Sequence, residues 1–235
     1  MSKKKSDKAA VRVEGVEQAL TRAEQFIETY QKQIVWVVSV VLGIVVIYMA
    51  FQRFYVEKKS QEAAAQMFPA EQYFEKDDWG KALDGDGNNL GFVDIISDYK
   101  FTPSANLAKY YAGLCCLRID EFEEAISYLS KFKSKDIILS SIALGSIGDA
   151  YAQLGEPGKA ISFYKKAAQR KSNDFTSPLY LLRAGILLEN EGKLKEAGEL
   201  YERIKSDYAV STEGRTIDKY IARIKAKQLT INNCQ

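Results

Sequence analysis

The chain has 235 residues, of which 46% are hydrophobic and 27% are charged, and its formal net charge is +2. This composition predicts a folded chain with room for one sizeable domain and an appendage. The sequence contains no histidine, which excludes histidine-based general bases, catalytic triads and metal sites, and its three cysteines make no disulfide framework.

Residues 1–33 form a polar, basic tail that leads into an apolar stretch. Apolar residues recur there at alternating steps of three and four, which places them on one stripe of a helix: Val13, Val16, Leu20, Ala23, Ile27 and Tyr30. The main interpretation is a helix that is solvated or lies at a membrane interface. A coiled-coil or partner-binding seam stays an alternative, because the pattern covers fewer than three heptads.

Residues 34–51, IVWVVSVVLGIVVIYMAF, are eighteen consecutive residues without a charge. As a helix they span about 27 Å, enough for a bilayer core. The run is too long for a cleaved signal peptide, and YMA at 48–50 is not a small-x-small cleavage site. We therefore predict a retained signal anchor over residues 34–52. Ser39 and Gly43 have the spacing of a small-xxx-small pair that packs against a second transmembrane helix, although glycine is also common in such helices without this role.

Basic residues favour one orientation of this anchor. The tail carries seven of them, Lys3, Lys4, Lys5, Lys8, Arg12, Arg22 and Lys32, and Arg53, Lys58 and Lys59 crowd the other flank. A long C-terminal part translocates largely regardless of its charge. The short basic tail therefore favours an N-terminus in the cytoplasm.

Residues 53–105 are expected to form a degenerate first helical repeat and a loop. Pro69 is expected to kink or split a helix over residues 57–76, and Trp79 opens a second, short helix. The loop DGDGNN resembles the start of a calcium-binding EF-hand loop, but Asn89 replaces the required glycine and Ile95 the bidentate glutamate. We expect no metal and no other cofactor.

Two landmarks recur in a single register over residues 106–211. Glycines stand at positions 113, 148 and 185 and alanines at 125, 160 and 197, so both series step by 35 and then by 37. The central unit, residues 141–174, matches the tetratricopeptide (TPR) pattern at Leu144, Ile147, Gly148, Tyr151, Gly155, Ala160, Tyr164 and Ala167. The pattern predicts three TPR units, each a closely packed helix pair. The expected fold class is all-α: a TPR helical solenoid with a single N-terminal transmembrane helix.

Cys115 and Cys116 lie inside the first helix of their unit, with Cys116 in register with Tyr151 of the next. We interpret both cysteines as buried packing groups rather than redox or nucleophilic centres. No nucleophile and base can be paired from the motifs, so catalytic residues are not expected.

Residues 212–235 are predicted to form a capping helix and tail. Ile217, Tyr220, Ile221 and Ile224 would close the end of the stack. The other face carries a basic stripe of Arg215, Lys219, Arg223 and Lys227. A solvated face is the main interpretation, and contact with an acidic partner or anionic lipid is the alternative. Residues 52–235 contain 26 basic and 26 acidic residues, a balance that does not favour nucleic acid.

The first helix of each TPR pair lines the concave side of a solenoid, where peptides bind. We predict a partner groove formed by Tyr110, Leu114, Leu117, Arg118, Asp149, Gln153, Leu182, Ile186, Glu189 and Asn190. The Lys/Asn clamp of TPR domains that grip a chaperone's C-terminal carboxylate is missing, because Tyr110, Gly145 and Leu182 stand at the first of its positions and Leu114, Asp149 and Ile186 at the second. Our hypothesis is that the groove takes up an apolar segment of a partner or the chain's own flanking helix.

The basic tail, the anchor and the segments LAKYYAGLCCLRIDEFEEAISYL, ALGSIGDAYAQLG and STEGRTIDKYIARIKAK together resemble the bacterial YfgM family of membrane-anchored TPR proteins. The loop LDGDGNN is similar to versions of the family in Bacteroidota. The resemblance implies an ancillary subunit of the Sec translocon in the bacterial inner membrane, with its TPR domain in the periplasm. Its implied partners are translocon subunits, a membrane-anchored prolyl-isomerase-like chaperone and emerging secreted chains. The alternatives are an adaptor of another envelope secretion or assembly machine, or a membrane-tethered adaptor that faces the cytoplasm.

Overall fold

The computed structural model describes residues 30–33 and 35–233 and divides the chain into two compact units, residues 1–56 and 57–235. The predicted amphipathic stripe before Tyr30 lies outside the described residues, as does Cys234. The described residues are helical and contain no strand, which confirms the predicted all-α fold.

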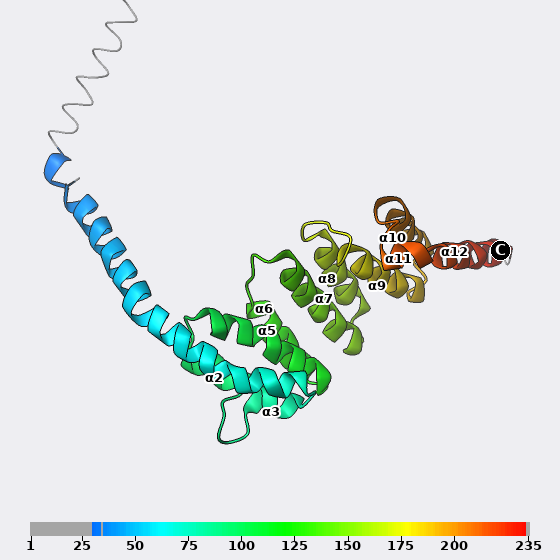
Figure 1. The fold of residues 1–235 in the computed structure, drawn as a ribbon. Coiled ribbons are helices and arrows are strands. Elements are labelled where there is room, and N and C mark those ends of the chain that lie inside the picture. The colour runs from blue at the N-terminus through cyan, green and yellow to red at the C-terminus, as the bar shows by residue number, and fades with distance from the viewer. Residues whose placement is uncertain (1–29, 34, 234–235) are drawn as a thin grey trace, which may run out of the picture. The chain divides into compact units, whose positions relative to one another are not determined.

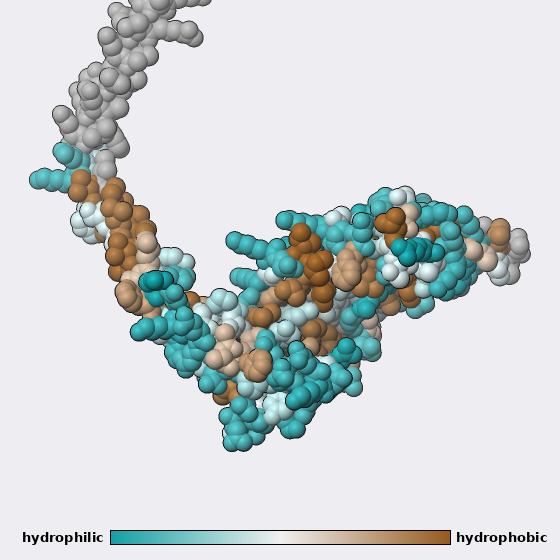
Figure 2. All heavy atoms as spheres, viewed as in Figure 1, coloured by the Kyte–Doolittle hydropathy of each residue, from teal (hydrophilic) through white to brown (hydrophobic). Residues whose placement is uncertain are grey.

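The described part of the first unit is an apolar helix. Residues 35–50 are helical, and a wider π-helical turn, η1 (Phe51–Val56), follows. The helix is long and apolar enough to cross a membrane, and the structure buries none of its apolar stretch. Figure 2 shows this helix brown along most of its visible surface, in contrast to the mostly teal second unit.

The second unit is a series of helices joined by short connections (Figure 1). Their bounds are α2 (Glu57–Glu75), α3 (Trp79–Asp84), α4 (Phe92–Asp98), α5 (Pro103–Arg118), α6 (Phe122–Lys131), α7 (Ile137–Gln153), α8 (Pro157–Gln169), α9 (Ser177–Asn190), α10 (Leu194–Asp207), α11 (Thr212–Thr216) and α12 (Asp218–Asn233). The pairs α5/α6, α7/α8 and α9/α10 correspond to the three predicted TPR units.

Prolines and short polar residues set the starts of the main helices. Pro103, Pro157 and Pro178 lie in the first turns of α5, α8 and α9, where a missing N–H leaves no helical bond unmade. Thr102 and Asp136 cap α5 and α7 by accepting hydrogen bonds from backbone amides three residues on. Local sequence therefore determines where each repeat begins.

The periodic glycines and alanines pack the helix pairs. A Cβ atom added at Gly113, Gly148 or Gly185 would collide with a side chain of the second helix in the same pair: Leu129, Tyr164 and Tyr201 respectively. The alanines at positions 125, 160 and 197 are fully buried. The predicted role of these small residues in close helix packing is confirmed.

The helix before the repeats lies close to its expected position, at Glu57–Glu75. Pro69 does not split it, because α2 continues unbroken through this residue. Proline removes the hydrogen bond to the carbonyl four residues earlier, and here that residue, Ala65, is exposed to solvent. The loop that follows α3 is closed by Asp86, whose carboxylate accepts hydrogen bonds from Tyr73, Asn88 and Asn89.

The predicted terminal helix is two helices. It breaks at Ile217, between α11 and α12, and the Ile217 side chain is fully buried. Ser211 caps α11 by accepting a hydrogen bond of 2.9 Å from the Gly214 amide. The break turns Ile217 into the core formed with Ile221 and Ile224, so these residues close the stack as predicted.

Candidate partner-binding groove

The predicted groove residues come from α5, α7 and α9, the first helices of the three pairs. Leu114 and Leu117 on α5, and Leu182 and Ile186 on α9, are half-buried. They leave part of their apolar surface accessible. Arg118, Gln153 and Asn190 lie at the C-terminal ends of these helices, away from the core residues.

Tyr110 is a packing residue rather than an accessible groove residue. Its side chain is buried in a cluster with Leu129, Ala143 and Ile147, which joins the first pair to the second. Its ring lies 5.3 Å from the ring of Phe132, centroid to centroid.

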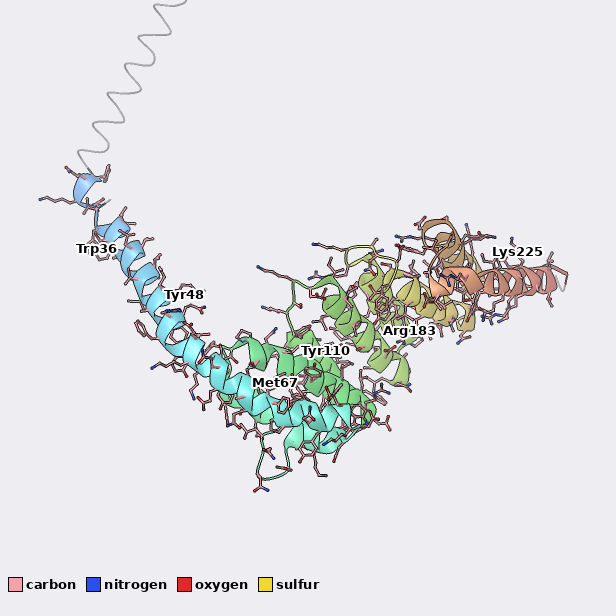
Figure 3. All side chains as sticks on the ribbon, viewed as in Figure 1. Trp36, Tyr48, Met67, Tyr110, Arg183 and Lys225 are labelled. Atoms are coloured by element: carbon pink, nitrogen blue, oxygen red, sulfur yellow. The ribbon has the colours of Figure 1, made fainter. Side chains whose placement is uncertain are left out.

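Asp149 on α7 is bound within the chain. Its carboxylate accepts a hydrogen bond of 2.6 Å from the Tyr164 hydroxyl on α8 and forms a close ion pair with Arg183. Figure 3 labels Arg183 on α9. Burial, together with the hydrogen bond to Asp149, raises the pKa of Tyr164 above its ordinary value. The hydroxyl therefore remains a donor at every physiological pH, and Asp149 links two consecutive repeats.

Sequence reasoning missed Arg183 and Tyr180. The Tyr180 ring occupies the space where a side chain at position 145 would stand. Gly145 therefore allows close packing between two consecutive repeats, whereas the periodic glycines allow it within a helix pair. Burial raises the pKa of Tyr180 to about 12. The guanidinium of Arg183 lies 5.7 Å from the centre of this ring. A signal for the ion pair exists in the sequence, since Asp149 and Arg183 are opposite charges 34 residues apart, close to one repeat.

Glu189 is the most deeply buried acid at the C-terminal end of the groove. Its side chain is 3% exposed, and it accepts hydrogen bonds of 2.7 Å from Arg223, 2.8 Å from Lys227 and 3.2 Å from Tyr201. Burial alone would raise the pKa of Glu189, but the hydrogen bonds from Arg223 and Lys227 outweigh it and hold the pKa below its ordinary value. Glu189 is therefore ionised and bound to α12.

The basic stripe is divided by this arrangement. Arg223 and Lys227 bind Glu189, Lys219 lies 5.1 Å from the ring centre of Tyr220, and Arg215 is exposed on the separate helix α11. Glu189 of the same chain is thus the acidic partner of two of the four basic residues, Arg223 and Lys227. The break at Ile217 also separates Arg215 from the other three residues.

The two described cysteines are buried, as predicted. Cys115 and Cys116 are 0% and 1% exposed. Burial raises the pKa of each thiol to about 12, so neither forms the thiolate that nucleophilic or redox chemistry requires.

Ser39 and Gly43, the small-xxx-small pair of the apolar helix, are exposed in the structure. A Cβ added at Gly43 would meet no other atom within 4 Å, and Ser39 is exposed. The surface at this pair is therefore accessible to a helix of another protein.

Comparisons with known proteins agree with this geometry. A model of the tetratricopeptide repeat family matches residues 143–179, which cover most of α7, all of α8 and the start of α9. No curated protein matches the chain. A crystal structure of nearly identical TPR-like repeats from a putative kinesin light chain of Podosopora anserina, in a form with one substitution, is 12% identical, with a TM-score of 0.55 over 76% of this chain and 92% of that one. A second structure of these repeats is also 12% identical, with a TM-score of 0.55 over 74% of this chain and 90% of that one. Residues 143–179 thus match a tetratricopeptide repeat, and the chain has the all-α TPR-like solenoid fold of these structures.

Proposed function

We propose that this protein is a single-span membrane adaptor that holds partner proteins in its TPR groove, as an ancillary subunit of the Sec protein-translocation channel. The exposed apolar helix of residues 35–50 carries the proposal, because an apolar surface on every side of a helix is stable in lipid and not in water.

The groove supports a binding role rather than a chemical one. Its accessible residues are apolar at Leu114, Leu182 and Ile186, whereas its acids Asp149 and Glu189 are already bound to cations of the same chain. An apolar segment of a partner would bury this surface without displacing an ion pair.

The assignment to the Sec channel comes from the resemblance of the tail, the anchor and the repeats to the YfgM family. In this assignment the repeats face the periplasm and act beside a membrane-anchored prolyl-isomerase-like chaperone on emerging chains. The open surface at Ser39 and Gly43 is the site at which the anchor would pack against a helix of the channel.

The experiment places a photo-crosslinking amino acid at Gly43 in the full chain, expressed in its native membrane. Crosslinks to a channel subunit or to the membrane-anchored chaperone are expected. A crosslinker at Val41 serves as control, because residues 41 and 43 lie about 200° apart around the helix, on nearly opposite faces, at about 100° per residue. Crosslinks to components of a different machine would contradict the Sec assignment. Release of the chain from membranes by alkaline carbonate would contradict the anchor itself.

A further inference from the structure

The connections between the helices of the second unit fall on two edges of opposite charge. Residues 99–102, 132–136, 170–176 and 208–211 each lead into the first helix of a pair or of the cap, and we name them the loop edge. Residues 76–78, 119–121, 154–156 and 191–193 each join a first helix to the helix that follows, and we name them the turn edge. Antiparallel helices place these two sets at opposite ends.

Hydrogen bonds tie neighbouring loops of the loop edge together. The Asn106 side chain, at the start of α5, bonds the backbone of Lys133 at 2.7 and 3.1 Å. The Arg170 side chain donates to Ser140 at the start of α7 at 3.3 Å. Three of the loops therefore lie at neighbouring positions along this edge.

The charge of the two edges differs in sign. The loop edge contains five basic and two acidic residues, a net charge of +3: Lys100, Lys133, Lys135, Arg170, Lys171, Asp136 and Asp174. The turn edge contains two basic and six acidic residues, a net charge of −4.

The loop edge also exposes apolar side chains. Phe101 is 69% exposed, and Phe175 and Val210 are each 71% exposed. Among the described residues of the second unit no other large apolar side chain is as exposed, and each of the three lies in a different loop. Exposed aromatic and basic residues on one surface are the composition that binds a lipid–water interface.

A cavity on the loop edge brings three of its basic side chains together. A cavity of about 490 Å³ between the connection 132–136, the start of α7 and the end of α8 is lined by Lys135, Arg170, Lys171, Ser134 and Ser140, together with Ile137 and Gln169. The lining contains no acid. Ammonium, guanidinium and hydroxyl donors around one space suit a phosphate group.

The chain enters the second unit at this same edge. Lys59, near the start of α2, lies 5.2 Å from the ring centre of Tyr99, and Glu62 accepts a hydrogen bond of 3.0 Å from the Tyr99 hydroxyl. Glu57 follows the apolar helix of residues 35–50 by seven residues, a stretch that spans at most about 25 Å when extended. A short tether keeps the loop edge at a high effective concentration near any membrane that holds the anchor.

We infer that the loop edge docks on the surface of the bilayer by binding anionic phospholipid headgroups, with Phe101, Phe175 and Val210 entering the interface. The inference rests on the proposed membrane anchorage. Docking leaves the turn edge directed away from the lipid, which repels its acids.

The test uses the full chain reconstituted into nanodiscs of phosphatidylcholine alone or of an equimolar mixture with phosphatidylglycerol. Hydrogen exchange is followed by mass spectrometry in the four loops and the four turns. The loops are expected to exchange about tenfold more slowly in the anionic discs, because each basic residue near such a surface contributes about fivefold in affinity. The turns are expected to exchange equally in both, and about 1 M salt should remove the difference.

Charge reversal provides the matched variants. The triple variant K133E/K135E/K171E is expected to lose the slowing, whereas K76E/K193E/K195E, with the same change of composition at or beside the turn edge, is expected to keep it. Equal exchange of the loops in the two lipids would overturn the inference, as would protection that survives the first triple variant. Loss of an acidic protein partner in that variant, with no effect of lipid, would assign the surface to a protein instead. A chain that fails to remain with nanodiscs of either composition would overturn the anchor as well.

Discussion

Arg223 on α12 donates a hydrogen bond of 2.7 Å to Glu189 on α9, across 34 residues of sequence. Arg183 on α9 pairs with Asp149 on α7 across the same separation of 34 residues. In both cases a tyrosine of the intervening helix also donates to the acid, Tyr201 to Glu189 and Tyr164 to Asp149. Helix α12 is therefore attached to the last repeat by the kind of contact that connects two repeats to each other.

The first prediction concerns the contact between Glu189 and the cations of α12. It compares the unfolding free energy lost when the cations are replaced with the unfolding free energy lost when the acid is replaced. Replacing both cations, R223A/K227A, leaves a buried carboxylate unpaired and is expected to cost about 3 kcal/mol of unfolding free energy. Glu189→Gln leaves half-exposed cations that water can solvate, and is expected to cost about 1 kcal/mol. Urea unfolding measures both, and equal costs would contradict the burial argument.

The second prediction concerns pH. Because the folded-state pKa of Glu189 lies below its usual 4.5, its contribution to stability is complete above the unfolded pKa and is lost as pH falls through the folded value. The stability of the wild type should therefore decline below about pH 4.5 more steeply than that of Glu189→Gln. Thermal unfolding from neutral pH down into this acid range measures the effect, with parallel curves for the two proteins as the contrary result.

The third prediction concerns the contact glycines. Gly185→Ala places a Cβ against the ring of Tyr201 and is expected to destabilise the fold by about 1–3 kcal/mol. Gly198→Ala in α10 is the control, because its Cβ would meet only Ile224 at an ordinary 3.7 Å. The control should gain up to about 1 kcal/mol from helix propensity. Chemical denaturation compares the two variants, and a neutral Gly185→Ala would show that the tyrosine ring can move away.

The fourth prediction concerns the cysteines. With Cys234→Ser as background, Cys115 and Cys116 should resist thiol reagents in the folded protein under mildly alkaline conditions, because burial raises the pKa of both thiols to about 12. Labelling should become complete in denaturant. Fast labelling of the folded chain, measured by intact mass, would disprove the packing role.

The repeat register and the apolar helix could be predicted from the sequence because they depend on local spacing. Small residues at a period of 35 to 37 require close packing wherever they occur, and eighteen uncharged residues are apolar on every face. The starts of α5, α7, α8 and α9 follow from a proline or a capping residue such as Thr102.

The contacts within the groove depend on three-dimensional packing and could not be predicted in the same way. The burial of Tyr110 depends on contacts with Leu129 on α6 and with Ala143 and Ile147 on α7, and the break at Ile217 depends on a core supplied by α9 and α10. The four-residue spacing of the basic stripe could be read from the sequence. That Arg223 and Lys227 bind an acid of the same chain depends on the position of Glu189 in the folded structure.

The central claim is that the accessible apolar residues of the groove bind partner proteins at the membrane. The most direct measurement is copurification of partners with the full chain carrying L114E/I186E, with S127E/S162E on the outer helices α6 and α8 as the control. The account predicts that the groove variant loses its channel and chaperone partners while remaining folded and membrane-bound, and that the control retains them. Retention of all partners by the groove variant would contradict the account.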